Sequence, residues 1–173
     1  MPEGIQYVGY KAKEEALFKP YLLKRLTDYE PSEKKDRETG AITLRKVKED
    51  VFENIEMLFG SRAHLSHIEL REDEELISSV LGFGIIDYCG KSFGRQEREI
   101  LRQNIIEQLT FFEPRIDPST IEVKLTDSED NPSFLMAFRI SGTIRVGQLS
   151  EELLFISRLN LETGSAEVMS LTE

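Results

Sequence analysis

The sequence has one cysteine and no apolar run long enough to cross a bilayer. Because Cys89 has no second cysteine to pair with, an intramolecular disulfide framework is excluded and a reducing compartment is indicated. No stretch approaches the ~20 consecutive apolar residues of a membrane span. The opening residues, MPEGIQYVGYKAKEE, lack the apolar core of a signal peptide. We therefore expect a soluble, cytoplasmic protein.

Positive charge is scarce. Lysine and arginine number 22 against 32 acidic residues, for a net charge of −10, and such a chain lacks the clustered cations that nucleic acid or an anionic membrane requires. Residues 1–46 differ, with 10 basic and 8 acidic groups, a net +2. The polar run PSEKKDRETG reads as a connector. We predict a docking segment with its linker over residues 1–40 and a main domain over 41–173. Alternatively, the N-terminal segment packs back on its own domain.

Groups with metal-binding or catalytic spacing are also few. His64 and His67 fall short of the three protein ligands of a catalytic metal site. The acidic run 72–75 has the character of a solvated helix start. Cys89 has no activating neighbour, and the glycines of 82–94 do not follow a strand with phosphate-loop spacing. No cofactor, metal or catalytic residue is therefore expected.

Two hydrophobic periods divide the remaining chain. Apolar residues recur at helical spacing in the first half and alternate after Pro118. Between the helices, residues 82–94 are expected to run along a helix or under a sheet, with Cys89 as a small buried thiol. A turn follows the third strand, with Gly164 at a positive φ, and Gly142 is a candidate bulge. The pattern predicts an α+β fold, N-terminal helices followed by an antiparallel β-meander. The expected helices are 47–59, 74–81 and 95–112, and the expected strands are 121–126, 134–144, 153–159 and 166–171.

The helix over residues 95–112 ends abruptly at Glu113-Pro114-Arg115. Proline disfavours helical dihedrals in the residue before it, so the helix should stop near Phe112. Two interpretations of the charges that follow stay open. Glu113 and Arg115 form an internal ion pair that caps the helix, or one of them meets an opposite charge on a partner protein.

Five segments in a fixed order resemble the TssE family, subunits of the bacterial type VI secretion baseplate that are similar to a small wedge protein of contractile phage tails. They are LLKRLTDYEP, NIEMLFGSRAH, SSVLGFGIIDYCG, FFEPRI and LNLETGSAEV. The resemblance covers about residues 20–170. One departure is Asp28-Tyr29, where the family often has two aspartates before Glu-Pro.

The resemblance implies a single handshake-like domain, similar to the one by which sheath subunits exchange strands. It implies a noncatalytic baseplate component that connects the wedge to the contractile sheath and helps to initiate sheath assembly. The implied partners are TssF, TssG, TssK and the sheath, at a secretion complex on the cytoplasmic side of the inner membrane. The implied contact residues are Glu113, Pro114 and Arg115 in one motif and Leu22, Leu23, Arg25, Leu26, Asp28 and Pro31 in the other.

Two further expectations concern mechanism. An exposed edge in the terminal hairpin, residues 153–171, could accept a strand from another chain by β-augmentation. The alternative function is a peptidoglycan-cleaving, lysozyme-like enzyme, because the phage relatives have been called lysozyme-like. Glycoside hydrolysis would need a pair of carboxylates across a cleft.

Overall fold

The computed structural model describes residues 43–64, 74–90, 94–126, 134–147 and 149–171, and also Leu26 and Ser32. The chain divides into two units, Met1–Asp50 and Val51–Glu173. The predicted boundary at residue 40 stays a prediction.

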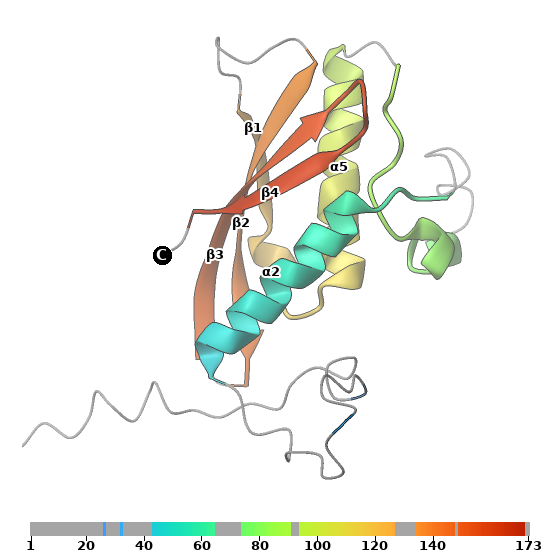
Figure 1. The fold of residues 1–173 in the computed structure, drawn as a ribbon. Coiled ribbons are helices and arrows are strands. Elements are labelled where there is room, and N and C mark those ends of the chain that lie inside the picture. The colour runs from blue at the N-terminus through green and yellow to red at the C-terminus, as the bar shows by residue number, and fades with distance from the viewer. Residues whose placement is uncertain are drawn as a thin grey trace, which may run out of the picture. The chain divides into compact units, whose positions relative to one another are not determined.

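Helices come first and strands last, as the sequence predicts (Figure 1). The helical part comprises α2 (Leu44–Gly60), α4 (Glu74–Ile77), the 3-10 turn η2 (Val80–Gly82), α5 (Arg95–Phe112) and the 3-10 turn η3 (Pro118–Thr120). The strands are β1 (Glu122–Thr126), β2 (Leu135–Val146), β3 (Leu149–Asn160) and β4 (Ala166–Ser170). They form one antiparallel sheet in the order β1-β2-β3-β4. The α+β meander is therefore confirmed.

One face of the sheet carries the hydrophobic core. Phe138, Ile140 and Phe155 are at most 1% exposed, and alternation along the strands points them to the same side. Phe59 of α2 meets Phe155 edge to face, with ring centroids 6.1 Å apart. On α5 the predicted apolar stripe is buried at Leu101, Ile105 and Leu109, each at most 2% exposed. In Figure 1, α5 runs beside the sheet.

Two polar side chains of α5 are also buried, and the sequence pattern did not single them out. Asn104 and Gln108 are 3% and 0% exposed. Gln108 accepts a hydrogen bond from the Gly84 N–H at 3.0 Å and donates to the Gly82 carbonyl at 2.8 Å. Asn104 accepts from the Ile86 N–H at 3.2 Å. These amides hold residues 82–86 against the helix, as expected for this part of the segment 82–94.

Three local expectations are wrong. The helix predicted over 74–81 breaks after Ile77, because the Ser79 hydroxyl accepts the Leu81 N–H and starts η2, which leaves Val80 89% exposed. Gly142 is not a bulge, since β2 and β3 stay in register through it; a Cβ there would lie 2.9 Å from Ile116 Cγ2. Cys89 is only partly buried, and a hydrogen bond with Asp87 raises the pKa of its thiol.

The turn between β3 and β4 requires a glycine. The φ of Gly164 is +70°, which confirms the prediction, and a Cβ there would lie 2.7 Å from Cys89 Sγ and 2.9 Å from Arg62 Nη2. Gly90 has almost the same φ, +69°, but nothing lies within 4 Å of its Cβ position. The two glycines share the conformational requirement and differ in the space around them.

We expect Gly164→Ala to lower the free energy of unfolding by about 2 kcal/mol. About 1 kcal/mol reflects the left-handed backbone, and the rest reflects displacement of the Arg62 and Cys89 side chains. Gly90→Ala is the matched control and should show the backbone cost alone. Urea unfolding of both variants measures the difference, and equal losses would show that the contact with Arg62 and Cys89 contributes nothing.

Candidate partner-binding site

The corner after α5 is built around a buried carboxylate. Glu113 is the C-terminal cap of α5, and its N–H donates to the Leu109 carbonyl at 3.0 Å. Its side chain is 1% exposed. One carboxylate oxygen accepts from Arg115 Nε at 2.5 Å, and the other accepts from Arg115 Nη2 at 2.6 Å and from Asn54 Nδ2 at 3.0 Å. This two-pronged pairing is the strong geometry for arginine and a carboxylate.

The internal ion pair, the first of the two interpretations of Glu113-Pro114-Arg115, is therefore present. Glu113 faces the interior and α2, whereas Pro114 is exposed and the Arg115 side chain is 22% exposed. A contact between this corner and a partner stays a prediction. Pro114 and the outer part of Arg115 are the groups that could make it.

The corner also closes one edge of the sheet. β1 pairs with β2 only as far as Ser141. Beyond that point the Arg115 carbonyl accepts the Arg145 N–H at 2.8 Å, and the Asp117 N–H donates to the Thr143 carbonyl at 2.9 Å. Residues 115–117 thus continue the edge that β1 leaves, and β2 is paired on both sides.

The side chain of Asp117 also holds residues 115–117 against β2. Its side chain accepts the Ser119 N–H and hydroxyl at 3.0 and 2.7 Å, and it forms an ion pair with Arg145 at 2.5 Å. The hydrogen bonds from Ser119, followed by the charge of Arg145, lower the pKa of Asp117. The carboxylate therefore stays charged, and the link between corner and strand is kept, over the neutral pH range.

At the same level of the sheet, the edge of β3 that faces away from β2 is open in the described part of the chain. β3 pairs with β4 only from Phe155 to Leu159, and the Leu171 N–H adds one bond to the Leu154 carbonyl. Backbone groups of alternate residues point to the same side of a strand, so those of Glu152 and Ser150 face the side that Leu154 faces. In the described part of the chain no strand pairs with this edge over Leu149–Leu153.

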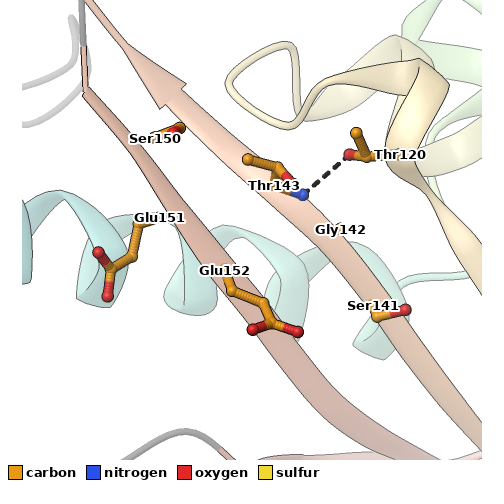
Figure 2. Close-up of a pocket in the computed structure, with 7 residues that line it drawn as sticks. All are labelled: Thr120, Ser141, Gly142, Thr143, Ser150, Glu151 and Glu152. Carbon is orange, nitrogen blue, oxygen red and sulfur yellow. Dashed lines mark hydrogen bonds between the residues drawn. The ribbon is translucent and has the colours of Figure 1, made fainter.

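A shallow polar pocket lies over this end of the sheet (Figure 2). Its volume is about 330 Å³. The Thr143 N–H donates to the Thr120 hydroxyl at 2.9 Å, which ties η3 to β2. Glu151 and Glu152 follow one another on β3, so their side chains leave on opposite faces, as Figure 2 shows. The lining consists of Thr120, Ser141, Gly142, Thr143, Ser150, Glu151 and Glu152.

The second predicted contact motif stays a prediction, because only Leu26 of its residues is described. Leu26 is 74% exposed, which is compatible with a docking role. Leu22, Leu23, Arg25, Asp28 and Pro31 lie outside the described residues.

The structure describes only some of the candidates for chemistry. His64 follows the end of α2, while His67 and residues 72–73 lie outside the described part. Among the residues that the structure describes, no three histidine, cysteine or acidic side chains are grouped as metal ligands. No helix among them is long and apolar enough to cross a membrane.

The protein-family model of the baseplate wedge protein gp25 matches residues 45–148. The chain belongs to the gp25 family. The match runs from the start of α2 to the end of β2 and therefore includes the Glu113-Pro114-Arg115 corner and both buried amides of α5. Neither the curated proteins nor the solved structures give a match.

Membership of the gp25 family confirms the resemblance at the level of the baseplate wedge. The chain is a structural component of a phage-type baseplate, and its partners are other baseplate proteins. The sequence reasoning located the corner but missed its supports, Asn54 on α2 and the pairing with β2. Asn54 lies four residues before the buried Leu58, and this position beside an apolar stripe was the available signal.

Proposed function

We propose that this gp25-family chain is a TssE-type subunit of a type VI secretion baseplate. It connects the wedge, through TssF and TssG, to the contractile sheath and initiates sheath assembly. Its place is the cytoplasmic side of the inner membrane. Support comes from the family match and from the five segments in TssE order, of which LLKRLTDYEP and LNLETGSAEV lie outside the matched range.

The observation that carries the proposal is the open edge of β3 over Leu149–Leu153. At the same level of the sheet, the other edge of β2 is already paired with residues 115–117, so among the described strands the open edge of β3 is the place where an incoming strand could pair with β2 or β3. The outward backbone groups of Ser150 and Glu152 would bond to that strand, since strand addition derives its affinity from main-chain hydrogen bonds.

The charges at this edge oppose pairing with a second copy. Glu152 is exposed on the open stretch. Two such edges brought together would place carboxylates close to carboxylates, which is a recognised protection against edge-to-edge aggregation. A strand that carries lysine or arginine at this level would be favoured instead.

The test is a substitution that removes one outward hydrogen bond. We expect Glu152→Pro to prevent sheath assembly in cells, because proline has no N–H to donate to the added strand. The protein should stay folded, since the N–H of residue 152 faces away from β2. Glu152→Ala is the matched control: it removes the same carboxylate but keeps the N–H, and it should support assembly.

Fluorescent sheath counts and the thermal unfolding midpoint are the measurements. Ser150→Pro affects the same side of the strand and serves as a second variant should Glu152→Pro unfold. Normal sheath formation by a folded proline variant would contradict the proposed use of this edge.

The carboxylates described at the pocket and at the corner favour this structural role over cleavage of peptidoglycan. Glycosidases place two carboxyl groups across a substrate cleft, at least ~5 Å apart and facing one another. Glu151 and Glu152 in the pocket point to opposite faces of the sheet (Figure 2). Glu113, the buried carboxylate, is occupied by Arg115 and Asn54.

A further inference from the structure

The face of the sheet opposite the core carries an apolar strip flanked by cations. Leu154 and Ile156 of β3 and Met169 of β4 point away from Phe155 and are each partly exposed. Leu171, next along the chain from β4, is 46% exposed. Among the described elements, α2 and α5 pack on the other face, so these side chains have no covering layer from them.

Three cations border this strip on its β2 side and at the Arg158 end, while Glu152 and Glu167 lie on the same face next to Leu154 and Met169. Lys124 of β1 lies directly opposite Arg139 of β2, and Arg139 lies directly opposite Ile156. Arg158 is opposite Ala137, which places it diagonally from Arg139. The segment 113–173 has only five basic residues, and three of them gather here although the segment is acidic overall.

Two of these cations are unpaired in the described part of the chain. Lys124 forms an ion pair with Glu122 at 2.8 Å. Arg139 and Arg158 are exposed, and no ion pair or side-chain hydrogen bond joins either of them to another described residue. Glu167 faces Arg158 across the β3–β4 ladder without such a pair. Lys124 and Arg139 are like charges directly opposite one another, which is destabilising in a sheet, so the isolated domain gains nothing from this pair.

We propose that this face, defined by Leu154, Ile156, Met169, Lys124, Arg139 and Arg158, binds an acidic amphipathic helix of another baseplate protein. Apolar residues of the helix cover the strip, and its carboxylates meet Arg139 and Arg158. The proposal rests on the proposed function, because it takes the partner from the baseplate wedge.

The geometry favours a helix over a strand. The face of a sheet offers side chains and no free backbone groups, whereas an added strand needs backbone partners and therefore uses an edge. A helix satisfies its own backbone and buries an apolar stripe against a sheet, which is the ordinary second layer of an α+β domain. The face is thus separate from the open edge of β3 and could be occupied at the same time.

Charge argues against two other occupants. Residues 1–46 of this chain are net positive, so the chain's own N-terminal segment is a poor match for Arg139 and Arg158. A second copy that presented the same face would place arginines against arginines. An acidic segment of a different protein avoids both conflicts.

The test uses the full chain with co-expressed TssF and TssG as the probe. We expect Arg139→Glu/Arg158→Glu to weaken binding to the wedge subunits about tenfold or more, because two attractive contacts become repulsive. Binding of the wild-type chain should weaken as salt rises, and that of the variant should not. Arg95→Glu/Arg98→Glu is the matched control, since it makes the same charge change on exposed positions of α5 and should bind as wild type.

A second pair of variants separates binding from folding. Arg139→Gln/Arg158→Gln removes the repulsion between cations, so its thermal unfolding midpoint should equal or exceed that of the wild type while binding falls. A photo-cross-linking residue at position 169 should then link to an acidic helical segment of TssF or TssG.

The outcomes are distinguishable. If the wild-type chain does not bind the wedge subunits, the proposed function and this inference are both wrong. If it binds and the reversed variant binds equally well, only the inference is wrong. A cross-link to a second copy of this chain, or to a basic segment, would also overturn it.

Discussion

Arg115→Ala is expected to lower the free energy of unfolding by about 2–3 kcal/mol. The substitution leaves the Glu113 carboxylate, 1% exposed, with Asn54 as its remaining hydrogen-bond donor among the contacts described above. Breaking a buried ion pair by removing one partner costs roughly 3–5 kcal/mol, and the 22% exposure of Arg115 reduces that range through solvent screening. Urea unfolding followed by circular dichroism measures the loss.

An exposed pair on the same helix provides the control. Arg102 pairs with Glu99 in a similar two-pronged geometry, but the two side chains are 35% and 61% exposed. Arg102→Ala should therefore cost at most about 1 kcal/mol. In the double variant Glu113→Gln/Arg115→Ala the loss should be smaller than in Arg115→Ala alone, because no buried charge is left behind. Equal costs for Arg115→Ala and Arg102→Ala would show that burial of Glu113 is unimportant.

The consequence for function is that Arg115 cannot be treated as a surface contact alone. A loss of sheath assembly in Arg115→Ala would combine a weaker fold with any lost partner contact. Substitutions at the exposed edge of β3, such as Glu152→Pro, leave the core intact and test assembly more directly.

Gln108→Leu is expected to destabilise the domain by about 3 kcal/mol. Leucine has nearly the same size but cannot hydrogen-bond, so the Gly84 N–H and the Gly82 carbonyl lose their partner at a fully buried side chain. Each buried polar group left unpaired costs about 1–3 kcal/mol, partly offset by the gain in apolar burial. Amide hydrogen exchange at Gly84 should accelerate in parallel with the loss measured by urea unfolding.

Gln103→Leu is the matched control for this substitution. Gln103 stands on the same helix, is only partly buried and makes no side-chain hydrogen bond to another described residue. Its replacement should change the unfolding free energy by less than about 0.5 kcal/mol. A small effect of Gln108→Leu, comparable with the control, would mean that water or a shift of residues 82–84 replaces the lost bonds.

Hydrophobic period and turn chemistry were sufficient to predict the main elements. The stop of α5 before Pro114, the four-strand meander and the positive φ of Gly164 each depend on a local rule that the structure obeys. The prediction failed where the helical spacing of apolar residues competes with a capping side chain. Val80 continues a helical apolar pattern, but the Ser79 hydroxyl captures the Leu81 N–H and ends it.

The site was less predictable because it depends on contacts between distant parts of the chain. These contacts join segments 18 to 59 residues apart. They are the backbone hydrogen bond from Arg145 to Arg115, the side-chain bond from Asn54 to Glu113, and the amides that hold residues 82–86. A periodic pattern indicates which face of a helix or strand is buried. It does not indicate which polar group of a distant segment will form a hydrogen bond with that face. Asn104 and Gln108 consequently carried no signal beyond their spacing with Leu101 and Leu109.

The hydrogen-bonded residue pairs of β2 and β3 at the open end of the sheet have a mechanical consequence. A strand added beside Ser150 and Glu152 would lie along β3, parallel or antiparallel to it. Twelve residue pairs join β3 to β2 on its other side. Tension along that strand would load those hydrogen bonds side by side, in shear, rather than peel them apart in sequence. Through Arg145 and Thr143 the same tension reaches residues 115–117 and then the end of α5. The corner would thereby act as an anchor point for pulling force.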